Sequence, residues 1–560
     1  ASLSEQKPSI SSNTVLRLDF DDPIPEHTDN LSNGSFSLNE KKILGLHKIV
    51  ATIDNAANDD KIKGIFLETD LLSVPGFSAT SELRKALQNF KDQGKFIIAY
   101  SKYYSQAAYY LASVADEVYM PPMGIIDMRG FAAQVPFYKE MLDKVGIEMQ
   151  VFYAGDFKSA TEPVRRREMS DSNRLQLRVF LDAMQNTMIG DIAKSRNIAP
   201  SDLEVLIDEF AGGVPKRAEA AGLVDSLAYR EDVLDAIRAK LGYSGDRKIK
   251  FASLSSYNKA NPPKMGDYDE ESRIAVVYAE GNVVDGKGNN GEIADLKYNK
   301  VFEKIRKSKK IKAVVLRINS PGGSSLSADN MYQAIEAIKE SGKPVIVSMG
   351  DYAASAGYYI AAHADSIIAQ ENTLTGSIGV FSMVPNAENM LNNKLGIKFD
   401  TVQTGKMSAG LTPFYGLSES EKKWFQTRTD VAYDSFLELV AEGRDMTKEE
   451  VGRIAKGRVW TGMKAKELGL VDEIGGMEKA IEIAAEKAGI SSYRLVEYPY
   501  VKSQFEQLLE ELSGDLDPST AFSKTLKAKY PALHASYDHI ESLINSKGLQ
   551  ATLPFVIPFE

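Results

Sequence analysis

The chain has 560 residues, which is too long for one hydrophobic core, so we expect two or more domains. Its apolar content of 43% and charged content of 26% are typical of a soluble globular protein. A formal net charge of −10 argues against nucleic acid as the main partner, and the absence of cysteine excludes disulfides, thiolate metal sites and cysteine nucleophiles. No stretch reaches the ~20 uninterrupted apolar residues of a membrane span.

The first part of the chain alternates between predicted strands and helices. Alternating apolar residues predict strands, and apolar spacings of three and four residues predict helices. A polar, serine-rich beginning is followed by a strand at 15–20, a loop at 21–39, a helix at 41–58, a strand at 61–67, a helix at 81–93 and a strand at 95–100. This alternation implies βαβ crossovers and a largely parallel sheet.

These elements return later in the chain at a constant displacement. The strand Lys61-Ile-Lys-Gly-Ile-Phe-Leu reappears as Lys310-Ile-Lys-Ala-Val-Val-Leu, and 310 minus 61 is 249. Tyr109-Tyr-Leu-Ala-Ser-Val-Ala-Asp reappears as Tyr358-Tyr-Ile-Ala-Ala-His-Ala-Asp at the same displacement. Such a period is far too long for a solenoid unit, so it indicates two homologous α/β domains in tandem.

Composition predicts the domain boundaries. We expect a first domain at 1–253, a linker at 254–272 and a second domain at 273–490. Residues 491–560 show no counterpart in the first copy, and we expect a C-terminal extension with helices near 503–513 and 537–546. Its apolar, proline-broken end at 551–560 is expected to dock on another surface, such as a neighbouring subunit.

Ser355 lies at a predicted corner between a strand and a helix. The β-branched run Lys343-Pro-Val-Ile-Val precedes Ser348-Met-Gly-Asp-Tyr-Ala-Ala-Ser-Ala-Gly-Tyr-Tyr, after which the spacing becomes helical. Small neighbours let a substrate approach closely, and the beginning of a helix offers free N–H groups. This environment suits a nucleophilic serine. On this segment alone, a small serine packed at a tight corner is the simpler explanation.

Comparison of the two copies singles out Ser355 and Lys158. The displacement puts Gln106 opposite Ser355, so the first copy lacks the serine. Tyr153-Ala-Gly-Asp-Phe-Lys-Ser-Ala-Thr-Glu-Pro aligns with Gln403-Thr-Gly-Lys-Met-Ser-Ala-Gly-Leu-Thr-Pro, which puts Lys158 opposite Ser408. The second copy therefore lacks the lysine. Because each copy holds what the other is missing, we expect one composite site at their interface.

A lysine is the predicted base for this serine. A serine hydroxyl is a poor nucleophile until a nearby base takes its proton, and a lysine can do so when burial keeps it neutral. His363 follows Ser355 by eight residues, about 12 Å along a helix axis, which is too far to touch it. The other histidines stay open as alternatives: His27, His47, His534 and His539.

Five motifs occur together in the two copies. They are Gly155-Asp-Phe-Lys-Ser-Ala-Thr-Glu-Pro, Ser320-Pro-Gly-Gly-Ser, the Ser348 to Tyr359 stretch, Leu374-Thr-Gly-Ser-Ile-Gly-Val and Gly457-Arg-Val-Trp-Thr-Gly. In combination they resemble the motifs of the signal peptide peptidase A (protease IV) family in its long tandem form. The resemblance covers roughly residues 15–490.

The resemblance implies roles for individual residues. Ser355 matches the family nucleophile, Lys158 the general base, and Ser377 the serine whose hydroxyl orients that lysine. Gly322 and Gly323, with the N–H of Ala356, match the groups that bind the oxyanion. Ala356 stands where the family usually has glycine, but it is still small and keeps its N–H.

The resemblance also implies fold, function and location. Each copy is expected to have a crotonase-like (Clp protease-like) fold, and the protein to be a Ser/Lys-dyad endopeptidase that degrades cleaved signal peptides or similar apolar peptides. A homo-oligomer is implied, a tetramer in the family. It would be held at the bacterial inner membrane by an N-terminal anchor upstream of this soluble chain, with the catalytic part outside the cytoplasm. No metal, organic cofactor or nucleic acid is expected.

Two other functions stay open from the sequence. The crotonase-like fold also hosts acyl-CoA enzymes, which set carboxylates against a thioester, although no carboxylate pair differs between the copies as Ser355 and Lys158 do. In a non-catalytic oligomeric scaffold, general decay would explain the loss of the serine from the first copy.

Overall fold

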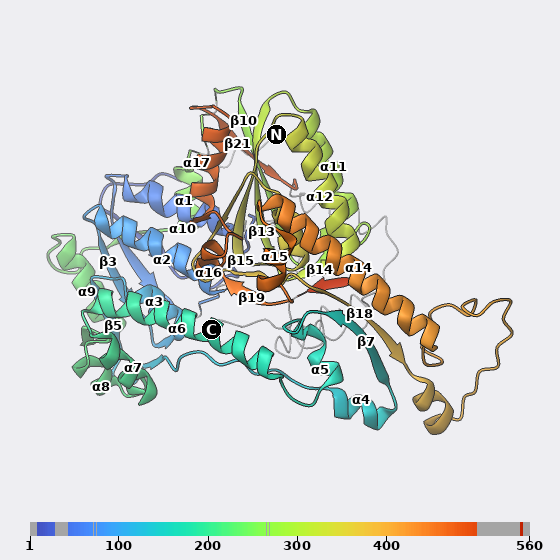
Figure 1. Ribbon diagram of the computed structural model, residues 1–560. Coiled ribbons are helices and arrows are strands. Elements are labelled where there is room, and N and C mark those ends of the chain that lie inside the picture. Colours follow the sequence, from blue (N-terminus) through green and yellow to red (C-terminus); the bar gives the residue numbers. More distant parts are fainter. Residues whose placement is uncertain are drawn as a thin grey trace, which may run out of the picture.

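The computed structural model describes residues 8–28, 43–70, 72–73, 76–264, 266–267, 269–289, 291–500 and 549–552 (Figure 1). The helices expected near 503–513 and 537–546, and residues 553–560 of the tail, lie outside the described residues.

The first copy is built on a parallel sheet with the strand order β8-β5-β3-β2-β1-β9. Leu16 and Ile65 pack on one face with helices α1, α2 and α3, whereas Val15 and Phe66 pack on the other face with α9. This alternation follows from the two-residue period of a strand. The elements are β1 (Thr14–Leu18), α1 (Leu46–Ala57), β2 (Ile62–Glu68), α2 (Phe77–Asp92), β3 (Phe96–Tyr100), α3 (Gln106–Ala112), β5 (Glu117–Met120), β8 (Ser226–Leu227), α9 (Arg230–Lys240) and β9 (Lys250–Ser253).

The second copy repeats this sheet in the order β20-β16-β15-β13-β10-β21. Helices α11, α12 and α13 cover one face and α17 the other. Each strand has its counterpart at the same place in the first sheet, so the prediction of two homologous α/β domains is confirmed. The elements are β10 (Arg273–Glu280), α11 (Asp295–Lys307), β13 (Ile311–Ser320), α12 (Ser325–Glu340), β15 (Val345–Ala354), α13 (Ala356–Ala361), β16 (Ser366–Ala369), β20 (Glu473–Ile474), α17 (Met477–Lys487) and β21 (Arg494–Tyr498).

A shorter pairing is also repeated, in the same register. In the first copy β4 (Tyr103–Ser105) pairs with β6 (Ile125–Asp127). In the second copy the end of β15 pairs with β17 (Leu374–Gly376), with every partner displaced by 249 residues. Gln106 therefore stands at the corner that Ser355 forms in the second copy. Its side-chain oxygen accepts hydrogen bonds from the N–H groups of Arg129 and Gly130, at 3.2 and 2.8 Å.

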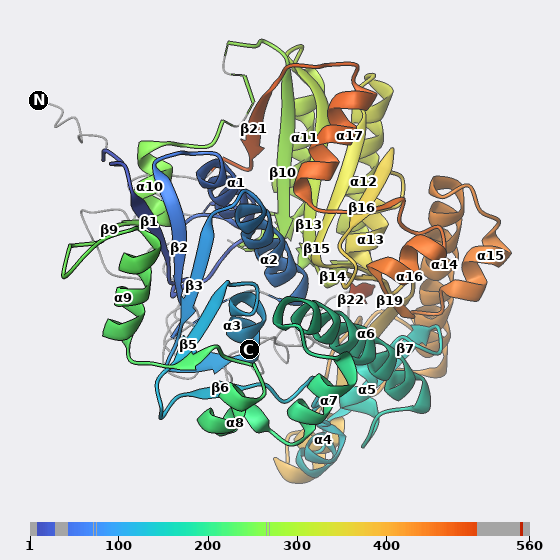
Figure 2. The same cartoon turned by 90° about the vertical axis from the view of Figure 1, so that its left-hand side faces the viewer.

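A third sheet joins the two copies. β7 (Glu148–Ala154) of the first copy pairs antiparallel with β18 (Val380–Asn386) of the second over seven residue pairs. Helix α14 (Glu419–Gly443) packs on both strands. Beyond β18 the sheet continues with β22 (Gln550–Thr552), β14 (Gly322–Ser324), β11 (Val283–Val284) and β12 (Ile293–Ala294). In Figure 2, α1 and α2 lie between the two large sheets, so the first copy turns this helical layer toward the second.

The structure corrects two boundaries that composition suggested. Residues 254–260, expected to begin the linker, form helix α10 (Leu254–Ala260), because the Ser253 side chain caps it and Tyr257 is buried against the first copy. Strand β21, in the supposed extension, pairs with β10 just as β9 pairs with β1. It therefore has a counterpart in the first copy, and the second domain extends past residue 490.

Candidate active site

Ser355 lies at a strained corner between β15 and α13. Its φ of 58° and ψ of −117° are unusual for a residue with a side chain, and such strain recurs where a nucleophile is held on a sharp strand-to-helix turn. The Ser355 N–H donates to the carbonyl of Gly376 at 2.8 Å, which ties the corner to β17. Beside it, Gly357 leaves room for Ser320, whose carbonyl oxygen would lie 3.0 Å from an added Cβ.

Lys158 comes from the first copy and meets Ser355 in the interior. Its Nζ lies 2.6 Å from Oγ of Ser355, and 3.1 Å from both Oγ and the carbonyl oxygen of Ser377. The lysine side chain is 1% exposed, and burial lowers its pKa well below 10.5. The three partners are uncharged, so nothing in this contact set restores the ammonium form. The structure therefore brings the three residues Ser355, Lys158 and Ser377 together.

Two features direct Lys158 toward the serine. Pairing of β7 with β18 carries the first-copy chain to the edge of the second copy, and the lysine follows four residues after β7 ends. The loop then docks on residues 456–458: the Phe157 N–H donates to the Lys456 carbonyl at 2.9 Å. Gly457, with φ of 76°, touches the lysine so closely that a Cβ there would lie 2.7 Å from Lys158 Cβ.

Gln176 on helix α6 (Asp171–Arg196) supports the lysine loop from behind. Its Nε2 donates to Oγ of Ser159 at 2.8 Å and to the Phe157 carbonyl at 3.3 Å. Its Oε1 accepts from the Val459 N–H at 3.3 Å. This glutamine thus links the lysine loop to the loop beside Ser377. Sequence reasoning missed it, because no local pattern marks a buried polar residue on a long helix.

The predicted oxyanion residues border the serine corner with unequal fit. Gly322 and Gly323 adopt φ of 116° and 150°, and an added Cβ at Gly323 would lie 2.0 Å from the Val283 carbonyl oxygen. The Gly322 N–H already points to Oγ of Ser320 at 3.2 Å. Ala356 opens α13, and α13 lies beside β14. Gly323 pairs with Val283 of β11 and with Ala551 of β22, whereas Ala356 begins α13 directly after Ser355, so the position of Ala356 suits an oxyanion best.

The described histidines contact residues other than Ser355. His363 is held by the Leu439 carbonyl at 2.8 Å and by the Tyr332 hydroxyl at 3.4 Å. His27 stacks on Tyr278 with ring centroids 4.4 Å apart. Burial lowers the pKa of His47. His534 and His539 lie outside the described residues. Among the described residues, Lys158 is the basic side chain that reaches Ser355.

A buried charge cluster fastens the strand that carries Ser355 to the first copy. Arg317 pairs with Glu26 at 2.8 Å and with Glu82 at 3.3 Å, across the two copies. Asp351, on β15, accepts from the N–H groups of Ser78 and Ala79 at the beginning of α2, at 2.8 and 3.2 Å. Burial, then the nearby Glu26, raises the pKa of Asp351 to about 7.

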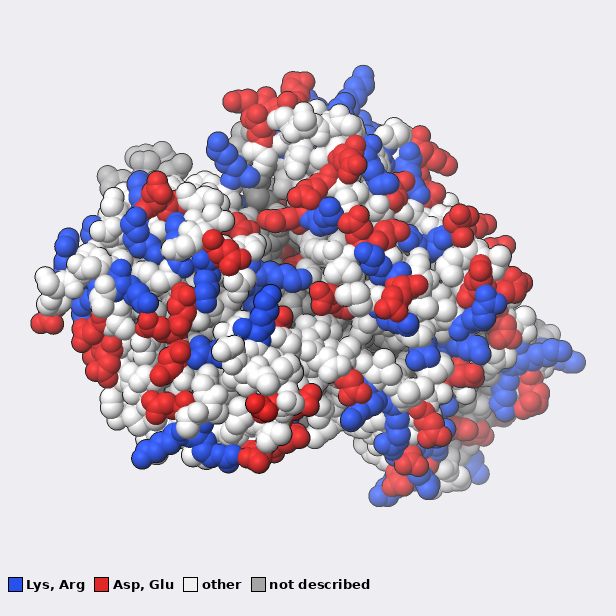
Figure 3. Space-filling view, turned by 60° about the vertical axis from the view of Figure 1, so that its left-hand side comes forward, with Lys and Arg blue, Asp and Glu red and all other residues white. Residues whose placement is uncertain are grey.

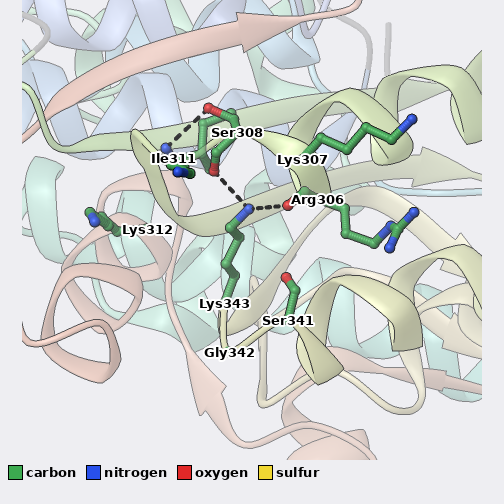
Figure 4. A pocket seen from close by; sticks show the side chains of 9 residues that line it. Arg306, Lys307, Ser308, Ile311, Lys312, Ser341, Gly342 and Lys343 are labelled. Atoms are coloured by element: carbon green, nitrogen blue, oxygen red, sulfur yellow. Dashed lines mark hydrogen bonds between the residues drawn. The ribbon is translucent and has the colours of Figure 1, made fainter.

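A pocket of about 430 Å³ opens at the other end of the second sheet (Figure 4). It is lined by the end of α11, by the residues before β13 and at its beginning, and by the residues that precede β15. Lys343 projects into its centre and donates to the carbonyls of Arg306 and Ser308, at 2.5 and 2.8 Å. Since β13 and β15 run from this pocket toward the serine corner, the pocket takes no part in the Ser355 site.

Two family models match the chain. The model described as peptidase family S49 matches residues 89–243 and again 337–491, and that of Clp protease matches 275–374. The chain belongs to peptidase family S49. This S49 peptidase is 35% identical to Protease 4 of Haemophilus influenzae over 489 residues, which is 85% of this chain and 79% of the relative. It is 33% identical to Protease 4 of Salmonella typhi (87% and 79%) and to the chloroplastic serine protease SPPA of Arabidopsis thaliana (91% and 74%).

Family membership makes this protein a serine peptidase with the two-copy organisation that the repeat predicted. It also decides against an acyl-CoA enzyme and a non-catalytic scaffold. In the described part of this S49 peptidase, no helix is both long and apolar enough to cross a bilayer.

Substituting Gly457 tests how tightly the lysine is held. We expect Gly457→Ala to lower kcat/KM about 100-fold, since an added Cβ displaces Lys158 and misplacement by about 1 Å costs that much. The matched control is Gly469→Ala, which has nearly the same φ, 78°, but meets only the Met446 sulfur at 4.0 Å. Both carry a similar backbone strain, so equal losses in peptide hydrolysis by the two variants would contradict a steric effect on the lysine.

The raised pKa of Asp351 predicts that the free energy of unfolding depends on pH. Its folded-state pKa, about 7, lies above the unfolded value of 3.8, so the folded state binds the proton more tightly. Stability therefore falls as the pH rises from about 4 to about 7 and is level above that range. Asp351→Asn keeps the oxygen that accepts from α2 and removes the ionisation. We expect its Tm advantage over the parent to grow across this window, as measured by calorimetry; a constant difference would refute the assignment.

Proposed function

We propose that Ser355 and Lys158 form the catalytic dyad of this S49 peptidase. The observation that carries the proposal is the 2.6 Å contact between a buried lysine, whose pKa burial lowers, and a buried serine on a strained corner. A neutral amine has a lone pair that accepts the hydroxyl proton. Ser377 orients the amine through its hydroxyl and carbonyl oxygens without holding it charged.

The geometry supports a two-step acyl transfer. Lys158 takes the proton of Ser355, and the alkoxide attacks the scissile carbonyl while the N–H groups of Gly323 and Ala356 bind the oxyanion. The lysine ammonium then gives that proton to the leaving amine as the C–N bond breaks. A water loses its proton to Lys158 and attacks the acyl ester, which releases the second product and restores the serine hydroxyl.

An extended apolar peptide is the proposed substrate, and cleaved signal peptides are the class that the motif resemblance implies. The tail strand β22 supports this mode of binding. Residues 550–552 pair antiparallel with β14, and Gln550 also meets Phe381 of β18. The edges of β14 and β18 both border the corner at Ser355, so a substrate strand can add to these edges by main-chain hydrogen bonds. The tail was expected to dock on another surface, and its described part docks on this chain.

We further propose that the protein works as a homo-oligomer, a tetramer in the resembled family, held at the bacterial inner membrane by an anchor outside this sequence, with its catalytic part outside the cytoplasm. Acidic and basic side chains are mixed over the face in Figure 3, and an area with few charges lies in its lower middle. A surface of mixed charge favours a solvent-exposed catalytic part over one that binds polyanions.

The pH profile tests the dyad. Because the pKa of Lys158 lies well below 10.5, the amine is neutral above that lowered value and protonated below it. Activity should therefore rise with pH through one ionisation well below 10.5. Lys158→Arg should be nearly as inactive as Lys158→Ala, since guanidinium does not release its proton. We would measure hydrolysis of an apolar peptide from about pH 6 to about pH 10, a range that brackets such a pKa.

Ser355→Ala and the double variant complete this test. Ser355→Ala should abolish both hydrolysis and labelling by a fluorophosphonate, while circular dichroism stays unchanged. The two residues act as one unit, so the double variant should resemble either single variant. If Lys158→Arg kept more than about a tenth of the parental activity, the lysine would not be the general base.

The position of β22 predicts that the tail competes with the peptide substrate for the same strand edges. A chain ending at residue 548 lacks β22, so the edges of β14 and β18 are free for a peptide. We expect a lower KM for long apolar peptides and an unchanged kcat. A chain ending at residue 552 keeps β22 and serves as the control. A KM that does not differ between the two chains would show that β22 does not occupy the substrate edge.

A further inference from the structure

The pocket at the far end of the second sheet is lined by cations. Five of its nine lining residues are basic and none is acidic; the basic ones are Arg306, Lys307, Lys309, Lys312 and Lys343. Figure 4 shows Arg306 and Lys307 on one side of Lys343 and Lys312 on the other. Lys307 pairs with Glu303, but no carboxylate in the described part of the chain pairs with Arg306, Lys309 or Lys312. The pocket therefore holds positive charge that the described residues do not neutralise.

The first copy contains the same lysine in the same position. Lys95 donates to the carbonyls of Ala56 and Asp59, at 2.7 Å each. Lys343 donates, at 2.7 and 2.8 Å, to the carbonyls of the two residues that stand 249 positions later. In both copies the amine thus satisfies carbonyls at the end of a helix, which is a structural task. The two copies can therefore be compared position by position around this lysine.

In the first copy, carboxylates compensate the charge of the lysine. Burial lowers the pKa of Lys95, and Asp59 and Asp60 oppose this shift. The Asp59 carboxylate also accepts from the Tyr257 hydroxyl and from the Asn261 amide at the end of α10, each at 3.0 Å. The charges at this position are thus balanced within the chain, and α10 packs against it.

In the second copy, this compensation is missing. Ser308 and Lys309 stand where the first copy has its two aspartates. Burial, and then the nearby Lys312 and Arg306, lower the pKa of Lys343. Like charges held close together repel one another, so an anion from solution is attracted to this pocket. The comparison that singled out Ser355 and Lys158 therefore also singles out a second place where the copies differ in chemistry.

We propose that this pocket binds a small dissolved anion that carries two or more phosphate groups. The guanidinium of Arg306 matches the geometry of a phosphate, and lysine binds phosphate as a point charge. Because the cations lie on both sides of Lys343, a chain of phosphates contacts more of them than a single phosphate does. The volume of about 430 Å³ is in the range of small-ligand sites, roughly 300–1,000 Å³.

The surroundings favour a dissolved ligand over a lipid surface or a long polyanion. A face that lies on a membrane combines its cations with large apolar side chains. In the described part of the chain, none of the exposed large apolar residues lines this pocket. The net charge of −10 and the mixed charges in Figure 3 argue against a long polyanion such as nucleic acid. A few cations around one pocket are enough for a small anion.

Titration calorimetry with inorganic triphosphate tests the proposal. We expect one saturable site per chain at about 0.1 M salt, where charges are screened beyond ~10 Å. The variant Arg306→Ala/Lys309→Asp introduces the residues that the first copy has at these positions, Ala57 and Asp60. It should bind triphosphate at least about tenfold more weakly, because one cation is lost and another becomes an anion. Inorganic orthophosphate should bind the parent at least about tenfold more weakly than triphosphate does.

A matched variant controls for net charge. Lys194→Ala/Lys216→Asp makes the same change of net charge with exposed lysines on α6 and α8 (Pro215–Ala220), and should bind triphosphate like the parent. Peptide hydrolysis should be unchanged in both variants, which shows that both fold, since the pocket lies at the end of the sheet away from Ser355.

Four results would overturn the proposal. The first is no saturable binding of triphosphate up to about 10 mM, far above the concentration that a specific site needs. The second is an equal loss of affinity in the two variants, which would show a general effect of net charge. The third is equal affinity for orthophosphate and triphosphate. The fourth is pocket-dependent binding to vesicles of phosphatidylcholine and phosphatidylglycerol without binding of triphosphate, because the ligand would then be a lipid headgroup.

Discussion

The buried amine of Lys158 is the group on which the arrangement of the two copies depends. Its partners are two hydroxyl groups and a carbonyl, so it is favoured as a neutral amine only while water is kept away. An acidic partner would have held it charged, and exposure would have restored its ordinary pKa. Neither copy can enclose this group alone, because the lysine is on one and the serine on the other. Separating the copies would therefore remove the proposed base and its changed pKa together.

Two independent ties keep the copies at the distance that this chemistry needs. The first is the main-chain pairing of β7 with β18, which extends over seven residue pairs and ends near the lysine loop. The second is the buried charge cluster, in which Arg317 holds Glu26 and Glu82 while Asp351 caps α2. A buried ion pair adds little net stability, but it strongly penalises any shift that separates its members. The cluster is therefore better understood as fixing the position of β15, whose end bears Ser355, than as a source of stability.

The sequence predicted the duplicated α/β core because its signals are local and occur twice. Strand period, helix spacing and a constant displacement agree at every element from β1 to β3 and from β10 to β15. The comparison of copies also brought out Ser355 and Lys158, since each position differs from its own counterpart.

The sequence did not reveal the β7–β18 pairing, which depends on contacts between residues more than 200 positions apart. Asp351 escaped for the same reason, because its partners Ser78 and Ala79 are more than 270 positions away. Gln176 escaped because no local pattern marks a buried polar residue on a long helix. The composition at 254–260 suggested a linker, but these residues form helix α10, because a serine caps the helix and a tyrosine is buried.

At the corresponding corner of the first copy, Gln106 stands in place of the serine, and its side chain is hydrogen-bonded. A serine without a base, or a neutral lysine without a serine, would leave a buried polar group poorly satisfied there. Gln106 instead accepts from the N–H groups of Arg129 and Gly130 and donates to the Gly130 carbonyl at 3.2 Å. Its amide is thus satisfied at donor and acceptor by the loop that corresponds to the one bearing Ser377. The backbone of this corner differs from that in the second copy, because α3 begins at Gln106 itself, whereas Ser355, with φ of 58°, precedes α13. In the proposed dyad, duplication separates two tasks that one domain would otherwise combine: the second copy positions Ser355, and the first delivers and buries Lys158.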